Sequence, residues 1–157
     1  MVKKVAVLPF RNISPRKEAG KIITNLFTQE LFKSGAFNVV ETGNTRDFFV
    51  RQRIRKTGEI DLDTIQMMGV QLGLDAVFLG IVEEYYQQEG GKNGISPQVA
   101  LSVRMINTKT GKIMWKCFHK KNGDDYIFIL DWGRISTCTV LAEKVIHEMI
   151  LTIKDKG

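Results

Sequence analysis

The spacing of apolar positions changes several times along the chain, and each change predicts an element. Val5–Leu8 and Ala76–Val82 are continuous apolar runs, which are typical of strands buried on both faces of a sheet. Pro9 should end regular pairing of the first strand, and Phe37–Glu41 is expected to form a short strand. The sequence turns polar at Glu83, so we expect the 76–82 strand to emerge into solvent there.

Four further segments show the three-to-four-residue apolar spacing of helices. We expect these helices over about residues 14–35, 44–56, 61–73 and 133–153. Ser14 and Pro15 suit the N-cap and first helical positions of the first helix, and Gly35, Gly58 and Gly73 supply stops. The residues expected to face the core are Ala19, Ile22, Ile23, Leu26, Phe27 and Phe32 in the first helix, Leu62, Ile65, Met68 and Leu72 in the third, and Ile135, Cys138, Ala142, Val145, Ile146, Met149 and Ile153 in the last.

Alternating apolar and polar residues predict a hairpin over Val99–Cys117, with a tight polar turn at Asn107–Lys112. Val99, Leu101, Val103 and Met105 should share one face of its first arm, as should Ile113, Trp115 and Cys117 of the second. We expect Gln87–Pro97 to be a loop. The order β-α-β-α-α-β-β-β-α, with right-handed crossovers, predicts an α/β fold with a mixed five-stranded sheet of order 2-1-3-4-5 and helices on both faces. One domain over residues 1–157 is the natural expectation.

Positive charge is concentrated in the first part of the chain. The net charge is +6, and residues 1–60 hold 12 Lys and Arg against 5 Asp and Glu. Arg46, Arg51 and Arg55 are candidate contacts for an anion, with Arg51 and Arg55 expected on one helix face. A nucleic-acid groove would normally add stacking aromatic residues beside such charges. A cytosolic nucleic-acid or nucleotide-binding module therefore stays the alternative hypothesis, beside a solvated basic face.

The residues capable of chemistry do not form a recognisable catalytic, cofactor or metal site. Cys117 and Cys138 lie 21 residues apart without CxxC spacing, and His119 and His147 do not complete a zinc pattern. The run Gly90–Gly94 lacks the spacing of a phosphate-binding loop. The sequence therefore predicts no enzyme and no cofactor, and it leaves open whether the cysteines form a disulfide or remain thiols.

The strongly apolar segment Tyr126–Trp132 lies between the last strand and the last helix. Core packing, a sixth edge strand and a flap over the end of the sheet are all compatible with it. An exposed apolar patch would instead mark a protein or membrane contact. We predict that Tyr126, Phe128, Leu130 and Trp132 contribute to a partner-contact surface.

Four segments resemble, in their order, the CsgG-like family of bacterial envelope lipoproteins: Val5–Phe10, Phe37–Glu41, Leu72–Gly80 and Val99–Trp115. This family includes the curli-secretion channel lipoprotein and the lipoprotein activators of penicillin-binding proteins, and the N-terminal domain of TolB is similar in architecture. The resemblance covers nearly the whole chain and implies one CsgG/TolB-N-like domain over residues 1–157.

The resemblance also implies a function and a location. It implies a non-enzymatic interaction or assembly domain in the periplasm, tethered to the outer membrane by an N-terminal lipid. The partner would be an envelope protein that the sequence does not identify. Self-association is compatible with the resemblance because the family's channels are rings, yet the absence of the channel-forming insertions removes part of the reason for a ring.

The sequence departs from the family pattern in two places. No lipidated cysteine occurs near the start, so membrane attachment would require a lipid absent from this chain. The connections Gln87–Pro97 and Lys121–Trp132 hold about a dozen residues each, whereas one transmembrane strand alone needs about 9–11. We therefore expect no pore.

Overall fold

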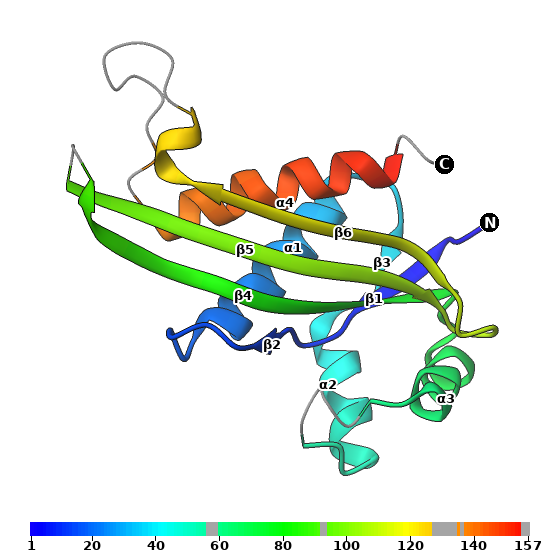
Figure 1. Ribbon diagram of the computed structural model, residues 1–157. Helices are drawn as coiled ribbons and strands as arrows, with labels where there is room; N and C mark the ends of the chain where they lie inside the picture. Colours follow the sequence, from blue (N-terminus) through cyan, green and yellow to red (C-terminus); the bar gives the residue numbers. More distant parts are fainter. Residues whose placement is uncertain (56–59, 92–93, 127–134, 136, 155–157) are drawn as a thin grey trace.

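The strands form one mixed sheet in which the order of neighbours is β3-β1-β4-β5-β6, with β2 paired to β4 (Figure 1). The computed structural model describes residues 1–55, 60–91, 94–126, 135 and 137–154. Its elements are β1 (Lys4–Val7), β2 (Arg11–Asn12), α1 (Ala19–Lys33), β3 (Asn38–Val39), α2 (Thr42–Arg51), α3 (Leu62–Leu72), β4 (Ala76–Gly91), β5 (Gly94–Asn107), β6 (Ile113–Asn122), the 3-10 helix η2 (Gly123–Tyr126) and α4 (Cys138–Lys154). The predicted order 2-1-3-4-5 is confirmed for the five expected strands.

The two-residue strand β2 is an addition to the predicted sheet. Strand β1 ends before Pro9, as expected, but the Leu8 amide still donates to the Phe78 carbonyl at 3.0 Å. The chain then returns to β4 in parallel register, with Arg11 beside Ile81. Proline therefore breaks the strand without ending its pairing to β4.

Helices cover both faces of the sheet, as predicted, but to different extents (Figure 1). Helices α1 and α4 pack against one face over a core that includes Phe27, Phe78 and Trp115. Helices α2 and α3 cover the other face through Phe48 and Met68, which pack near the start of β4. The long strands β4, β5 and β6 extend beyond α2 and α3, so much of their second face has no helix among the described residues over it (Figure 1).

Helix α1 differs from the prediction at its start and in one core position. It begins at Ala19 rather than Ser14, because the Ser14 hydroxyl donates to the Asn12 side chain instead of capping a helix. Phe32 is 70% exposed, whereas its neighbour Leu31 is fully buried. The helix ends at Lys33 and Gly35 takes a φ of +66°, as expected for the stop.

Helix α2 ends at Arg51, about five residues before the predicted end. The Arg53 amide donates to the Val50 carbonyl and the Ile54 amide to the Phe49 carbonyl, which is the Schellman arrangement of a helix C-terminus. Arg53 takes a φ of +57° there, a conformation usually supplied by glycine. No glycine signals this end, so the sequence pattern placed it too late.

The last two helices follow the predicted bounds more closely, although Leu62, expected to face the core, is 47% exposed. Helix α3 begins where the Asp61 carboxylate accepts from the Thr64 amide at 2.9 Å, and it ends at Gly73, whose φ is +65°. Helix α4 begins at Cys138, later than expected, but its predicted core-facing residues are all buried. Both cysteines carry thiols: Cys138 is buried and Cys117 half-buried.

The hairpin strands are longer than expected. Strands β4 and β5 stay paired beyond the predicted length: Gln87 pairs with Pro97, and Gly91 pairs with Gly94. The prediction of a loop from Gln87 to Pro97 is therefore wrong. A bulge pairs Met105 with Trp115 but Ile106 with Ile113, which places Ile113 on the opposite face from Trp115. Ile113 is accordingly 53% exposed rather than part of the core.

Candidate interaction surface on the open sheet face

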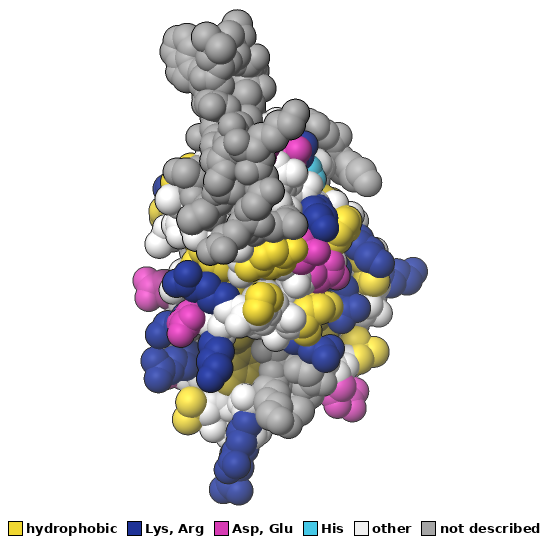
Figure 2. All heavy atoms as spheres, turned by 60° about the vertical axis from the view of Figure 1, so that its left-hand side comes forward, with side chains coloured by type: hydrophobic (Ala, Val, Ile, Leu, Met, Phe, Trp, Pro, Cys, Tyr) yellow, Lys and Arg dark blue, Asp and Glu magenta, His cyan; other side chains and the backbone are white. Residues whose placement is uncertain are grey.

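The uncovered part of the sheet presents rows of side chains from β4, β5 and β6. In register, Leu79 lies beside Arg104 and Arg104 beside Lys116. The next row joins Ile81, Ser102 and Phe118. We call this the open sheet face, defined by Ile81, Ser102, Arg104, Lys116 and Phe118; Leu79 is buried in the core under α2 and α3 and borders this face. Figure 2 shows Lys and Arg side chains gathered around hydrophobic ones on the side of the molecule that is at the left in Figure 1.

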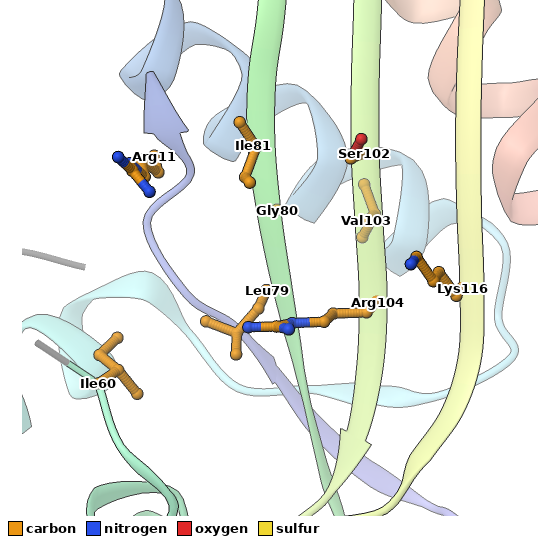
Figure 3. A pocket seen from close by; sticks show the side chains of 9 residues that line it. All are labelled: Arg11, Ile60, Leu79, Gly80, Ile81, Ser102, Val103, Arg104 and Lys116. Carbon is orange, nitrogen blue, oxygen red and sulfur yellow. The ribbon is translucent and has the colours of Figure 1, made fainter. Parts of the chain in front are cut away.

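A cleft of about 400 Å³ lies on this face (Figure 3). We call it the sheet cleft; it is lined by Arg11, Ile60, Leu79, Gly80, Ile81, Ser102, Val103, Arg104 and Lys116. Its three cations come from three different strands: Arg11 from β2, Arg104 from β5 and Lys116 from β6. Segments that are far apart in the sequence therefore bring positive charge to one place.

Gly80 explains how Arg11 reaches this cleft. A Cβ atom at residue 80 would lie 2.1 Å from the Phe10 ring, so only glycine lets that ring pack against β4. The Phe10 amide donates to the Thr24 hydroxyl at 2.9 Å, which attaches the same segment to α1. These contacts hold β2 beside β4 and set Arg11 next to Ile81.

The three cations of the sheet cleft have no ion-pair partner among the described residues. Arg11, Arg104 and Lys116 are all exposed. An exposed cation without a partner remains hydrated, and its field attracts an anionic group on an approaching molecule. The cleft can therefore accept carboxylates without first breaking an internal ion pair.

Two described carboxylates near the cleft have partners of their own. Glu83 accepts a hydrogen bond from the Ser102 hydroxyl at 2.9 Å. Glu84 pairs with the Lys120 ammonium at 3.0 Å, and this hydrogen bond raises the pKa of Lys120. These contacts direct Glu83 and Glu84 toward Ser102 and Lys120 rather than toward the cations of the cleft.

Phe118 adds an apolar contact to this charged surface. It lies in register with Ser102 and Ile81, and its side chain is 58% exposed. An exposed aromatic side chain on a rigid strand can bury its ring in a partner at low entropic cost. The chemistry of the open sheet face is thus that of binding, with cations around an apolar anchor.

The residues predicted as contacts lie elsewhere or outside the described structure. Arg46 and Arg51 are exposed on α2, and Arg55 follows the helix, so the expected shared helix face of Arg51 and Arg55 is wrong. Tyr126 is the last residue of η2, and of its side chain nothing is described. Phe128, Leu130 and Trp132 lie outside the described residues.

Sequence reasoning missed the cations and the aromatic ring of the open sheet face. Arg104, Lys116 and Phe118 occupy the polar phase of the alternation that predicted Val103 and Trp115 as core. That signal was available in the sequence. No comparable signal marked Arg11, because its two-residue strand is recognisable only beside β4.

Metal coordination and membrane crossing find no support in the described residues. These residues contain no group of three or more His, Cys, Asp and Glu side chains that could hold a metal ion. Among the helices that the structure describes, none has the length and apolar character needed to cross a membrane.

Comparisons with known proteins identify the family and the fold. The family model described as "Peptidoglycan-synthase activator LpoB" matches residues 3–118. No curated protein sequence matches the chain at a significant level.

Several solved structures share the fold. Lipoprotein GNA1162 from Neisseria meningitidis is 16% identical, with a TM-score of 0.70 and coverage of 98% of this chain and 99% of that one. A PelC dodecamer from Paraburkholderia phytofirmans is 19% identical, with a TM-score of 0.64 and coverage of 95% and 86%. The LpoB C-terminal domain from Escherichia coli is 12% identical, with a TM-score of 0.55 and coverage of 76% and 82%. At such identities these likenesses establish the fold alone.

Proposed function

The chain belongs to the peptidoglycan-synthase activator LpoB family, and from this premise we propose that it binds and activates a peptidoglycan synthase through its open sheet face. It would act as a non-catalytic regulator, changing the activity of its partner by contact. The sheet cleft would receive acidic side chains of the synthase, and Phe118 would pack against an apolar patch beside them.

Family membership agrees with the expected setting of the protein. It confirms the prediction of a periplasmic interaction domain of the lipoprotein type. The nucleic-acid alternative gains no support from the family. The wider CsgG-like relationship remains a proposal, supported by the order of the four segments that first indicated it.

The observation that carries the proposed surface is a cluster of cations that have no ion-pair partner among the described residues, on a part of the sheet that no described helix covers. Arg11, Arg104 and Lys116 converge on one cleft, and Phe118 lies one row away. The supporting strands are long and are fixed from behind by α1 and α4, so the contact groups are held in place before a partner arrives. Charges at such a rim mainly govern the association rate, whereas a buried aromatic anchor mainly governs dissociation.

The test uses the purified chain and the peptidoglycan synthase of the same organism in biolayer interferometry. Arg104→Glu and Lys116→Glu should lower the association rate, with wild-type binding weakening as salt increases. Phe118→Ser should raise the dissociation rate by about tenfold, equivalent to about 1.4 kcal/mol. Stimulation of glycan-strand synthesis should fall in parallel.

Lys144→Glu is the matched control, because Lys144 is an exposed cation on α4, away from the sheet cleft. It should leave both rates unchanged. If Lys144→Glu weakens binding as much as Arg104→Glu, net charge rather than this surface is responsible. If none of the sheet-face variants changes binding, the synthase contacts another surface.

Self-association is a separate proposal. It is supported by one structural neighbour, PelC, which forms a dodecamer. Multi-angle light scattering across a concentration series would show a single monomeric mass if the proposal is wrong.

A further inference from the structure

A second hollow lies between α1 and α2. It has a volume of about 650 Å³ and is lined by Val7, Pro9, Phe10, Asn12, Lys17, Gly20, Lys21, Thr24, Asn25, Thr42, Thr45, Arg46, Phe49, Val50 and Ile54. We call it the α1–α2 groove. Phe10 and Asn12 line it while Arg11 lines the sheet cleft, so the two sites use different residues of the same segment.

The groove combines an apolar floor with a positive rim. Phe49 and Val50, which is 69% exposed, supply apolar surface, whereas the Phe10 ring lies at the floor and is only 5% exposed. Lys21 on α1 and Arg46 on α2 carry charge from its two sides. In the described structure neither cation has a carboxylate within ion-pair distance.

Thr45 adds an unmet hydrogen-bonding group. Its side chain is only 3% exposed, it lines the groove, and its hydroxyl has no hydrogen-bond partner among the described residues. A buried hydroxyl without a partner costs roughly 1–3 kcal/mol. The hydroxyl oxygen is buried, so an acceptor brought by a ligand would remove that cost once the Thr45 side chain turned toward the groove.

A second depression lies farther along α1, toward its C-terminus. It has a volume of about 360 Å³, includes Phe32 and Val39, and shares Thr42 with the groove. Lys21 and Phe32 are eleven residues apart on α1, a span of about 16 Å at 1.5 Å per residue. Phe32 is 70% exposed at the far end, where α1 leaves an aromatic ring without cover from the described residues.

We propose that the α1–α2 groove binds an acidic amphipathic helix of about three turns, supplied by a partner protein. Its apolar stripe would lie on Phe49, Val50 and Phe32, and its carboxylates would reach Lys21 and Arg46. The length matches the span from Lys21 to Phe32, and cations on both sides match acidic residues flanking an apolar stripe better than they match one anionic head group. This inference does not rest on the sheet cleft: the chain would be an adaptor with two docking surfaces.

The test uses fluorescein-labelled synthetic peptides of about twelve residues, a little over three helical turns. The acidic probe has leucine at the i, i+3, i+4 and i+7 positions and glutamate elsewhere. A basic probe replaces every glutamate with lysine, and a polar probe replaces every leucine with serine. Fluorescence anisotropy should show the acidic probe binding at least about tenfold more tightly than either relative.

Variants then locate the binding site. Lys21→Glu and Arg46→Glu should each weaken the acidic probe by about tenfold, equivalent to about 1.4 kcal/mol. Thr45→Val should weaken it while leaving or raising thermal stability, because it removes a hydroxyl that has no partner among the described residues of the free protein. Lys144→Glu on α4 should have no effect.

Three results would overturn the inference. Equal binding of the acidic and basic probes would show that the groove does not select charge. Loss of binding on Arg104→Glu but not on Lys21→Glu would place the probe in the sheet cleft, leaving the proposed function intact. Groove variants that abolish binding to phosphatidylglycerol vesicles, or self-association by sedimentation, without affecting the probe would assign the groove to a lipid surface or a second copy.

Discussion

Gly80→Ala tests how much the packing of Phe10 against β4 stabilises the fold. This packing holds the segment that carries Arg11 beside the sheet cleft. The new Cβ would lie 2.1 Å from Cε1 and 2.4 Å from Cδ1 of the Phe10 ring, far inside normal contact distance. The ring is only 5% exposed and packs against Phe27 at a centroid distance of 5.5 Å. It therefore has no easy route away from the added methyl group, and either Phe10 or the β4 backbone must shift.

The expected cost follows from this overpacking. Inserting a methyl group into a filled core typically destabilises by about 1–3 kcal/mol. For a chain of this size the melting temperature falls by about 2–4 °C per kcal/mol, so a decrease of about 2–12 °C is expected. Phe10→Leu should open space for the methyl group, so Gly80→Ala should cost less in that background, with a coupling of about 0.5–3 kcal/mol.

Urea denaturation followed by circular dichroism measures these costs, with the midpoint shifted and the m-value unchanged. Gly43→Ala is the control, because nothing lies within 4 Å of a Cβ built there and residue 43 is in α2. Alanine should raise stability at that position, by up to about 1 kcal/mol. A Gly80→Ala protein as stable as the wild type, or strictly additive costs with Phe10→Leu, would refute the proposed role of the contact.

Two further predictions concern Thr108 in the hairpin turn and Asp75, which follows α3. Thr108 is 1% exposed, and its hydroxyl donates to the Leu74 carbonyl at 2.5 Å. Thr108→Val should therefore cost about 1–3 kcal/mol, and an unchanged urea midpoint would contradict this. Asp75 accepts hydrogen bonds from the Lys4 and Lys3 amides, which lower its pKa below the ordinary 3.8. Since the folded-state pKa is the lower one, this stabilisation is present above pH 3.8 and is lost as the pH falls through the folded-state pKa. Asp75→Asn should flatten the loss of thermal stability in acid; an acid profile identical to that of the wild type would disprove this.

Particular residues show why much of the fold was predictable. The apolar run Ala76–Val82 could be recognised as a central strand because no polar residue interrupts it. Asp61 and Gly73 marked α3 because capping depends on residues adjacent to the helix ends. The strand order followed from connectivity and crossover handedness once these elements were placed.

The errors occur where a distant segment decides a local structure. Arg11 forms a strand only because β4 supplies its partner, and the Gln87–Pro97 segment extends as a ribbon because its two strands pair with each other. Arg53 adopts a positive φ after the end of α2, and an arginine in the sequence does not predict this conformation. Phe32 has helical spacing suited to the core, yet it lies where no described element covers it.

By itself the sequence determined most of the elements, the order of the five expected strands and the inward phase of most strands and helices. Periodicity encodes these features because it reflects backbone geometry over a few residues. Only the tertiary structure decided which outward side chains meet and which parts of each face remain uncovered. Arg11, Arg104 and Lys116 are brought together by pairing across three strands, and Lys21 and Arg46 by the placement of two helices. Such groupings depend on how far each helix extends over the sheet, which no local pattern records.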